Sequence, residues 1–279
     1  MTDSEKIKLI VSDLDGTLLN RESLLSEANK EAVYALHEKG IAFTFATGRI
    51  DKMSWHYAEA LRLKLPIIGS NGAVLRRCGE TDCLWQQPLT EEVIERIRAL
   101  CDKASADHLY YGKDTVYYSP GSRRIRFFEK YNALADRSGQ EKLILSPLSD
   151  FPDGLPEKIS KVFVVMPEDP GKSSALDQAL QNLEGCECVV SVSGTRDLIP
   201  PGSSKGKAAA KLAESLGIPM EEVCCLGDQA NDISMLEQAG LAIGMRSGDP
   251  AIRPYCDCFA EHYNCDGFAR AVRQLFLRR

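Results

Sequence analysis

Two carboxylates stand where a buried strand is expected to end. Asp13 and Asp15 follow the apolar run from Ile7 to Val11, which predicts a buried β-strand. Side chains alternate along a strand, so both carboxylates leave its end on the same side, and Gly16 then allows the chain to turn. Because like charges disfavour each other, the pair must either hold a cation or have a raised pKa. The spacing therefore predicts a chemical site.

Three further segments place polar and small residues at the end of an expected strand or the start of an expected helix. They are Ala46-Thr47-Gly48-Arg49, Ser203-Ser204-Lys205-Gly206-Lys207 and Gly227-Asp228-Gln229-Ala230-Asn231-Asp232. Ligands of open α/β sheets bind beyond the carboxyl ends of the strands. The acids suit a hard cation such as Mg2+, and a lysine at a helix N-terminus with free N–H groups suits a phosphate. Together the four segments predict a site for a divalent cation and a phosphate.

These two ligands fit one reaction, a phosphoryl transfer. An aspartate that attacks phosphorus forms an aspartyl-phosphate, which splits one difficult displacement into two easier ones. Repulsion between the carboxylate and the phosphate opposes the attack. Two unit charges about 4 Å apart repel by about 4 kcal/mol at an effective dielectric near 20, so bringing a carboxylate to a phosphate dianion costs about 8 kcal/mol. Hydrogen bonds from Thr47 alone cannot offset this cost, whereas a divalent cation and a lysine can offset most of it. We therefore expect both in the mechanism.

Alternating strands and helices are expected to position these segments. The alternation predicts an α/β core with a parallel sheet. Its strands are expected at 7–13, 41–46, 65–69, 223–226 and 241–243, and its helices at 27–38, 54–61, 204–216 and 233–239.

The middle of the chain follows a different pattern. Short paired strands are expected at 108–111 and 115–118, after a helix that begins at Thr90. Further elements are expected near 123–136 (helix), 142–146 (strand), 159–166 (strand), 172–183 (helix) and 187–193 (strand). Paired strands with interleaved helices predict an α+β unit. We therefore predict a discontinuous core of residues 1–83 and 196–279, with an inserted α+β domain at 84–195.

Composition excludes several classes of function. The chain has 279 residues, of which 44% are apolar and 27% charged, as is typical of a soluble globular protein. A net charge of -6 argues against a nucleic-acid partner, which would require a basic face. No apolar run approaches the length of a membrane span, and the polar N-terminus leads directly into the first strand. We expect a cytoplasmic protein with no membrane partner.

Ten cysteines are scattered along the chain, several of them within apolar runs. Buried, reduced thiols are the expected interpretation. One group of zinc-capable side chains is closely spaced, namely Cys256, Cys258, His262 and Cys265. Its spacing fits neither of the common paired-cysteine zinc patterns, so a structural metal there is the less favoured hypothesis.

Taken in order, the four segments resemble the four motifs of the haloacid dehalogenase (HAD) superfamily. The stretches "SDLDGTLL", "FATGR", "PPGSSKGKA" and "GDQAND" are most similar to its Cof-type phosphatases, and residues 68–73 resemble a stretch that those proteins carry after the third strand. The resemblance spans essentially the whole chain. It implies a Rossmann-like HAD core with a parallel sheet, and it identifies the α+β insertion as a cap domain. It also implies Mg2+-dependent hydrolysis of a small phosphorylated metabolite, such as a sugar phosphate.

The resemblance implies a role for each residue. Asp13 would be the nucleophile and a Mg2+ ligand. Asp15 would be the general acid and then the base that activates water, and its backbone carbonyl would bind the metal. Lys205 would neutralise the phosphoryl group, and Asp228 would complete the metal site. Phosphate contacts are implied for Thr47, Gly48, Asn71 and Asn231, and a metal-ligand or neighbouring role for Asp232.

The chain departs from the family pattern after Ile243-Gly244. Residues 245–250 replace the usual Asn-Ala and lysine helix, so contacts that the family makes from this loop are not carried over. The later Asn264-Cys265-Asp266-Gly267 resembles the family's closing motif, with an unusual cysteine. A site role for Asn264 stays open.

Two other functions stay open as well. A phosphomutase would use the same aspartyl-phosphate and return the phosphoryl group to a sugar. A non-catalytic metabolite-binding protein is disfavoured because every acid of the implied metal site is present. Residues that determine substrate specificity are expected within 84–195. Four tyrosines there are either substrate contacts or part of the packing of the cap sheet, and three arginines are either substrate contacts or part of a solvated helix face (Tyr110, Tyr111, Tyr117, Tyr118, Arg123, Arg124 and Arg126). The sequence does not determine the oligomeric state.

Overall fold

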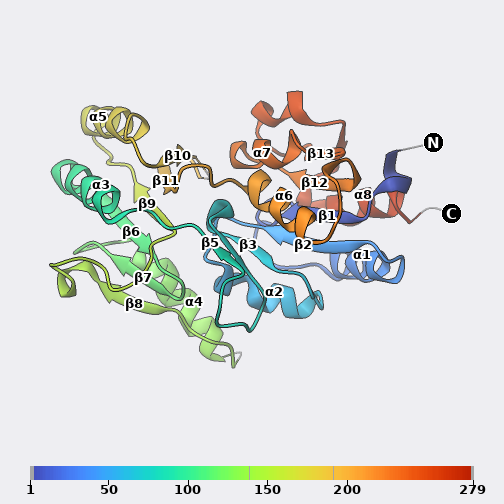
Figure 1. Cartoon of the computed structure of the whole chain (residues 1–279), viewed down its shortest axis with the longest axis horizontal. Helices are drawn as coiled ribbons and strands as arrows, with labels where there is room; N and C mark the ends of the chain where they lie inside the picture. The colour runs from blue at the N-terminus through green and yellow to red at the C-terminus, as the bar shows by residue number, and fades with distance from the viewer. Residues whose placement is uncertain (1–2, 138, 191, 278–279) are drawn as a thin grey trace. The chain divides into compact units, whose positions relative to one another are not determined.

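A computed structural model describes residues 3–137, 139–190 and 192–277. The chain divides into two units, drawn in Figure 1. The core unit consists of Met1–Trp85 and Ser204–Arg279, and the inserted unit of Gln86–Ser203. The second boundary therefore lies eight residues beyond the position expected from the sequence, after a strand that belongs to the inserted unit.

An eight-stranded sheet organises the core unit. The strand order is β14-β13-β12-β1-β2-β3-β4-β5, and neighbouring strands are parallel from β14 to β3, whereas β4 is antiparallel to β3. The strands are β1 (Leu9–Asp13), β2 (Ala42–Ala46), β3 (Ile67–Gly69), β4 (Val74–Arg76), β5 (Trp85–Gln86), β12 (Val223–Gly227), β13 (Leu241–Met245) and β14 (Cys258–Ala260). β1 and β12 are buried along their whole length, which explains why their sequences are continuous apolar runs.

Helices cover both faces of this sheet. One face packs against α1 (Glu27–Glu38), α2 (Trp55–Ala60) and α8 (Gly267–Leu275), and the other against α6 (Lys205–Ser215) and α7 (Ile233–Leu236). The Ser26 side chain caps α1 by accepting a hydrogen bond from the backbone N of Asn29, and Gly40, with φ +75°, follows its end. Within the residues described, we find no helix long and apolar enough to span a membrane.

The inserted unit is a six-stranded sheet with helices, in the order β10-β11-β9-β6-β7-β8. Its elements are α3 (Glu91–Ala104), β6 (Asp107–Tyr111), β7 (Thr115–Tyr118), α4 (Ile125–Arg137), β8 (Ile144–Pro147), β9 (Lys161–Val165), α5 (Pro170–Gln181), β10 (Glu187–Val189) and β11 (Thr195–Ile199). Most of its pairings are antiparallel, with β7 and β8 parallel. The predicted fold class, an α/β core with an inserted α+β unit, is confirmed.

Aromatic side chains pack both faces of the inserted sheet. Tyr110 and Tyr117 are buried in one cluster with α3 and α5, whereas Tyr111 packs edge to face on Phe128 of α4. The guanidinium of Arg124 lies 4.4 Å from the centre of the Phe127 ring. These contacts favour a packing role for the three tyrosines. Arg123 and Arg126 are exposed.

Four strands were not anticipated from the sequence. β4, β5 and β14 contain only two or three residues, too few for a recognisable alternation. β11 carries Arg196 and Asp197, which are unusual in a buried strand. Ion pairs make this possible, because Asp197 pairs with Lys161 at 3.0 Å and Arg196 pairs with Asp177 at 2.6 Å.

Candidate active site

Parallel pairing brings three of the predicted residues to one edge of the core sheet. β1 lies between β12 and β2, and Asp13 pairs in register with Ala46. Parallel strands end in the same direction, so Asp13, Thr47 and Asp228 lie together at the carboxyl edge. All three side chains are buried.

Lys205 reaches this group from the first turn of α6. The helix begins there because the Ser204 side chain accepts a hydrogen bond from the backbone N of Lys207 at 3.1 Å. The Nζ of Lys205 donates to Asp13 Oδ1 at 2.5 Å and to Asp232 Oδ1 at 2.6 Å. Its side chain is only 1% exposed, so it supplies a fixed, buried positive charge between two carboxylates.

Three carboxylates, those of Asp13, Asp228 and Asp232, could hold a metal ion. One oxygen of each lies within 4.8 Å of the others. Asp13 Oδ2 is buried and accepts no hydrogen bond. Asp228 accepts hydrogen bonds from two neutral groups, Thr17 Oγ1 at 3.2 Å and Gln229 Nε2 at 3.1 Å. Leaving a buried carboxylate oxygen without a partner is energetically costly. Carboxylate oxygens are the ligands that hard divalent cations prefer, so this donor set fits Mg2+.

Asp232 differs from the other two acids because donors engage both of its oxygens. Its Oδ2 accepts hydrogen bonds from the backbone N of Asp228 at 2.8 Å and of Gln229 at 2.9 Å, while Oδ1 accepts from Lys205. These bonds fix the loop that carries Asp228. The contacts favour a positioning role for Asp232 beside the metal ligands.

The charges of this group are unbalanced. Burial raises the pKa of Asp13 well above its usual range, and the neighbouring acids add to the effect although Lys205 opposes it. Burial, followed by the charge of Asp232, raises the pKa of Asp228 to about 6. Burial lowers the pKa of Lys205, but the charges of Asp13 and Asp232 outweigh it, so the net direction is upward. One lysine does not balance three buried acids, and a divalent cation would supply the missing positive charge.

Gly16 provides the space in which Asp228 lies. Its φ is +87°, a conformation that favours glycine, and a Cβ on it would lie 2.5 Å from Asp228 Oδ2. The turn after the first acid pair is therefore shaped by the approach of a residue more than 200 positions away.

Asp15 lies outside the acid group, in an ion pair that the sequence analysis did not anticipate. Its Oδ2 accepts a hydrogen bond from Arg49 Nε at 2.8 Å, and its Oδ1 accepts from Arg49 Nη2. Arg49 Nη2 also donates to Ser23 Oγ at 3.1 Å, and the guanidinium lies 5.8 Å from the centre of the Tyr57 ring. Burial lowers the pKa of Arg49, but Asp15 and Tyr57 raise it by more, so the net direction is upward and the guanidinium stays charged.

This pairing orients the Asp15 carboxylate, whose side chain is 47% exposed. The available signal was the arginine of the "FATGR" stretch, a segment that we identified without assigning Arg49 a role. Bidentate pairing of a guanidinium with a carboxylate is geometrically specific. Arg49 is therefore a functional candidate that sequence reasoning missed.

Polar groups also gather beside Thr47. The backbone N of Asn71 donates to Thr47 O at 3.0 Å, and Asn231 Nδ2 donates to Asn71 Oδ1 at 3.0 Å. Asn71 has a φ of +56°, which asparagine tolerates better than most residues. A Cβ at Gly48 would lie 3.0 Å from Asn71 Oδ1, and Asn231 Oδ1 is buried without a partner. The structure thus brings Thr47, Gly48, Asn71 and Asn231 together.

Comparison with known proteins identifies the family. The family model of the haloacid dehalogenase-like hydrolases matches residues 10–272. The chain belongs to this family. It is 28% identical over 272 residues to the 5-amino-6-(5-phospho-D-ribitylamino)uracil phosphatase YcsE of Bacillus subtilis (strain 168), covering 97% of this chain and 96% of that protein. It is 26% identical to the pyridoxal phosphate phosphatase YbhA of Escherichia coli (strain K12), covering 95% of this chain and 97% of the relative.

Solved structures of haloacid dehalogenase-like hydrolases agree with this assignment. One from Bacteroides thetaiotaomicron has a TM-score of 0.81 at 25% identity, covering 97% of this chain and all of that one. Another, from B. subtilis, has a TM-score of 0.83 at 23% identity with the same coverage, and it supports the fold alone. The family and its phosphatase members confirm the predicted enzyme class, a phosphoric monoester hydrolase.

In this haloacid dehalogenase-like hydrolase, the divergent loop after β13 supports Asp228 through its backbone. The backbone N of Asp249 donates to Asp228 O at 2.7 Å. A Cβ at Gly248 would lie 2.6 Å from the same oxygen. The loop therefore contributes backbone contacts and close packing to the candidate metal ligand.

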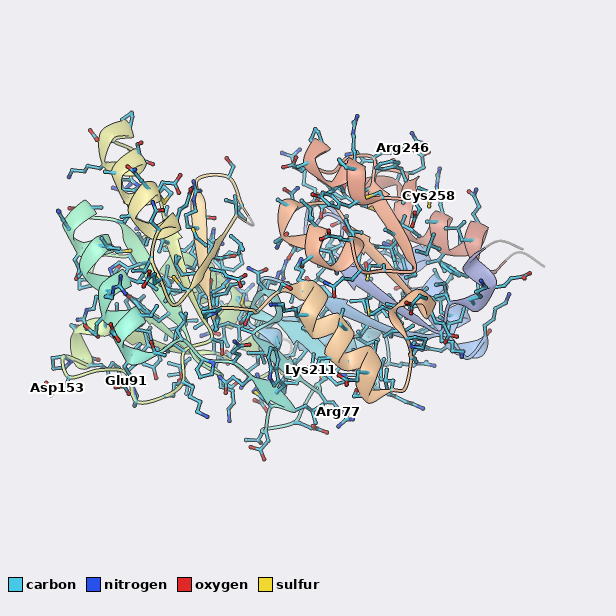
Figure 2. All side chains as sticks on the ribbon, turned by 45° about the horizontal axis from the view of Figure 1, so that its top comes forward. Arg77, Glu91, Asp153, Lys211, Arg246 and Cys258 are labelled. Carbon is cyan, nitrogen blue, oxygen red and sulfur yellow. The ribbon has the colours of Figure 1, made fainter. Side chains whose placement is uncertain are left out.

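Two other sequence candidates lie apart from the acid group. Asn264 Oδ1 accepts a hydrogen bond from the backbone N of Arg21 at 2.9 Å, so its contact is with the loop after β1. In the described part of the chain, the acid group is the one set of side chains placed to hold a metal, and it includes none of the four zinc-capable residues near the C-terminus. Cys256 donates to Ile252 O at 3.2 Å, and Cys258 lies on the edge strand β14, where it is labelled in Figure 2. All ten cysteines are free thiols.

Proposed function

We propose that this protein hydrolyses small phosphomonoesters with the help of Mg2+, through an aspartyl-phosphate formed on Asp13. The observation that carries the proposal is the state of the Asp13 carboxylate. One oxygen bonds Lys205, the other is buried and accepts no hydrogen bond, and the carboxylate belongs to one group with Asp228 and Asp232. The bond to Lys205 orients this carboxylate, and its free oxygen remains available for reaction, as is required of a nucleophile that also contributes to a metal site.

Asp13, Asp228 and the backbone carbonyl of Asp15 would hold the Mg2+, with Asp232 beside them. When bound, the ion would neutralise negative charge on the phosphoryl group and its attacking carboxylate. Lys205 would add a second, buried positive charge, held at Asp13 Oδ1. Thr47, Gly48, Asn71 and Asn231 would offer hydrogen bonds to the phosphoryl oxygens.

Proton transfer is assigned to Asp15. As the Asp13 oxygen bonds to phosphorus, the bond from phosphorus to the leaving oxygen breaks, and Asp15 gives that oxygen a proton. In the second step Asp15 takes a proton from the water that attacks the aspartyl-phosphate, which releases inorganic phosphate and restores Asp13. Arg49 is a positioning residue here, because it holds both oxygens of the Asp15 carboxylate.

The substrate is proposed to be a small phosphorylated metabolite. Support comes from relatives named as phosphatases of a phosphoribitylamino-uracil and of pyridoxal phosphate, and from a structural neighbour described as a sugar phosphatase. We propose that the inserted unit, Gln86–Ser203, is the cap that selects the leaving group, and that the core unit is the catalytic core. A cytoplasmic location is proposed as well, since ten free thiols fit a reducing compartment.

Asp13→Asn tests the central role, because it keeps the size of the side chain and removes the nucleophile. We expect it to abolish phosphate release from p-nitrophenyl phosphate, and chelation of divalent cations to do the same to the unaltered protein. Asp15→Ala is the matched variant, and mass spectrometry should detect phosphorylated Asp13 in it after substrate is added. Full turnover in Asp13→Asn, or in chelated protein, would refute the mechanism.

Product analysis separates the remaining alternatives. A phosphatase releases inorganic phosphate, whereas a phosphomutase returns an isomerised sugar phosphate. Absence of Mg2+ binding in calorimetry, together with absence of turnover, would support a non-catalytic binding protein.

A further inference from the structure

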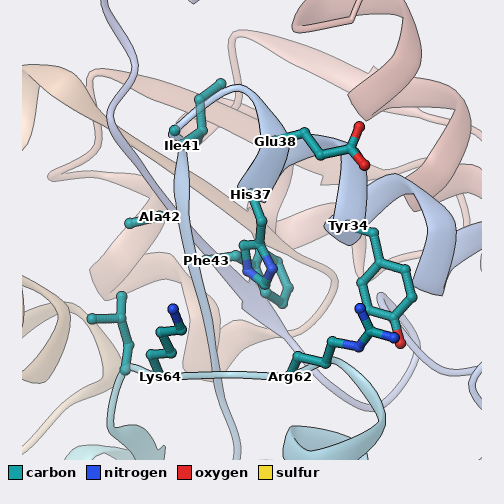
Figure 3. Close-up of a pocket in the computed structure, with 10 residues that line it drawn as sticks. Tyr34, His37, Glu38, Ile41, Ala42, Phe43, Arg62 and Lys64 are labelled. Atoms are coloured by element: carbon teal, nitrogen blue, oxygen red, sulfur yellow. The ribbon is translucent and has the colours of Figure 1, made fainter.

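A pocket of about 560 Å3 opens in the core unit away from the acid group. Its floor is the beginning of β2, whereas Thr47 follows the other end of the same strand. A strand of five residues spans about 16 Å, so the pocket lies near the opposite edge of the sheet. Figure 3 shows its lining, with Tyr34 and His37 from α1, Phe43 from β2, and Arg62 and Lys64 from the segment after α2. Its volume is in the range of small-molecule sites.

The body of the pocket is aromatic and held in place. Phe43 is buried and packs edge to face on Phe268. The hydroxyl of Tyr34 donates to Ala60 O at 2.7 Å, which fixes its ring. Burial, followed by the charge of Lys64, lowers the pKa of His37, which favours its neutral form. These walls offer flat, uncharged surfaces to a ligand.

Arg62 has an unusual backbone for an arginine. It follows the end of α2 with a φ of +54°, where its N donates to Glu59 O and the N of Leu63 donates to Ala58 O. Glycine is the usual residue at this position of a helix end, because other side chains are strained there. The guanidinium lies 4.6 Å from the centre of the Tyr34 ring, over the pocket wall. A strained residue with an oriented side chain is a candidate for a functional role.

Two positive charges stand at the mouth of the pocket without a counterion. Arg62 and Lys64 are exposed, and among the described residues neither has a carboxylate within ion-pair distance. In Figure 3 both reach in from the same side of the view, opposite Glu38. The protein as a whole carries a charge of -6. A locally cationic mouth over an aromatic body favours an anion with an apolar part.

We propose that this pocket binds a small organic anion with a flat apolar body, an aromatic carboxylate being the simplest member of the class. The ring would lie against Tyr34 and His37, and the anionic group would face Arg62 and Lys64. This site goes beyond the proposed phosphatase function and does not depend on it.

The first test uses 2-naphthoate as the probe and the full chain labelled with 13C at its methyl groups. Mg2+ and excess inorganic phosphate are present, so that the candidate active site is occupied. We expect saturable shifts of the Ile41 and Leu65 methyl signals, which belong to residues that line the pocket. The methyls of Leu14, between the two acids, should stay unshifted. The uncharged analogue 2-naphthalenemethanol should bind about tenfold more weakly, because it cannot pair with either cation.

The second test removes the two cations together, as Arg62→Asn with Lys64→Gln. Asparagine tolerates the left-handed backbone, so the fold should be kept. The control carries the same charge change at two exposed sites elsewhere, Lys103→Gln with Arg270→Gln. Affinity for 2-naphthoate, measured by calorimetry, should fall about tenfold in the first variant and stay unchanged in the control.

Three results would overturn the proposal. One is the absence of Ile41 and Leu65 shifts at about 10 mM probe, which corresponds to no useful affinity. Another is equal affinity in the two double variants. The third is shifts confined to Leu14, which would place the probe in the acid group.

Discussion

Lys205→Met removes the one positive charge that, among the described residues, contacts the buried acid group, and it keeps a side chain of similar length. In the unaltered protein, Lys205 Nζ lies 2.5 Å from Asp13 Oδ1 and 2.6 Å from Asp232 Oδ1. Both carboxylates are buried, so water cannot replace the lost partner. Removing one partner of a buried ion pair costs about 3–5 kcal/mol of stability. We expect a loss of that size in the metal-free protein at pH 8.

The same substitution should also impair catalysis. A unit charge about 4 Å from a phosphoryl group contributes about 4 kcal/mol at an effective dielectric near 20. Since about 1.36 kcal/mol corresponds to a tenfold change in rate, kcat/KM should fall by about a thousandfold. Both figures rest on one lysine, whose charge we propose stabilises the transition state as well as the fold.

Arg76→Met is the matched control. Arg76 and Asp51 form another buried ion pair of the core unit, at 2.6 Å and with exposed fractions of 0% and 2%. Urea unfolding should show a loss of similar size in both variants, and turnover of p-nitrophenyl phosphate with Mg2+, assayed well below both melting temperatures, should separate them. We expect Arg76→Met to keep kcat/KM within about tenfold of the unaltered protein. The reasoning is refuted if Lys205→Met keeps its activity, or if both variants lose it equally.

Two further predictions concern protons. Folding raises the pKa of Asp228 from its ordinary 3.8 to about 6 through burial, so the folded, metal-free protein binds more protons than the unfolded chain between these values. The contribution of Asp228 to stability, about 3 kcal/mol, is therefore fully present below about pH 4 and lost as the pH rises through 6. Melting of chelated protein should show this decrease of stability with pH, and Asp228→Asn and Mg2+ should each reduce it. A decrease of unchanged size in Asp228→Asn would contradict the assignment. Arg49→Gln should impair proton transfer by Asp15, so kcat/KM should fall at least tenfold more for an alkyl phosphate than for p-nitrophenyl phosphate, whose leaving group needs little protonation. Steady-state kinetics on both substrates checks this, and an equal loss on both would indicate that Arg49 does not act through Asp15.

The sequence predicted the core of the site because its residues lie where strands end or a helix begins. Asp13, Thr47 and Asp228 come directly after apolar runs, and parallel pairing makes the ends of such runs neighbours. Lys205 comes after a helix cap, which is also a local signal. These features need only short-range patterns and one topological rule, and the same holds for the α/β character of the core.

The contacts that the sequence did not reveal are tertiary contacts between polar groups. The pairing of Arg49 with Asp15 joins residues 34 positions apart, and neither side chain carries a periodic signal. Strand β11 was missed for a related reason, since its buried Asp197 forms an ion pair with Lys161 from another strand. Short-range patterns therefore identify apolar elements and the polar residues at their ends, while ion pairs across the fold decide which charged residues can be buried.

The acid group depends both on strand ends and on ion pairs across the fold, and its unbalanced charge supports the proposed metal site. Three buried carboxylates and one lysine destabilise the metal-free fold, and the raised pKa of Asp228 is the sign of that cost. The same excess negative charge favours a divalent cation, which a balanced site would not attract. Asp232 limits the cost because its two oxygens accept hydrogen bonds from Lys205 and from the backbone that carries Asp228. Asp13 is left with one oriented oxygen and one unpartnered oxygen, and that asymmetry separates it from the other acids as the proposed nucleophile.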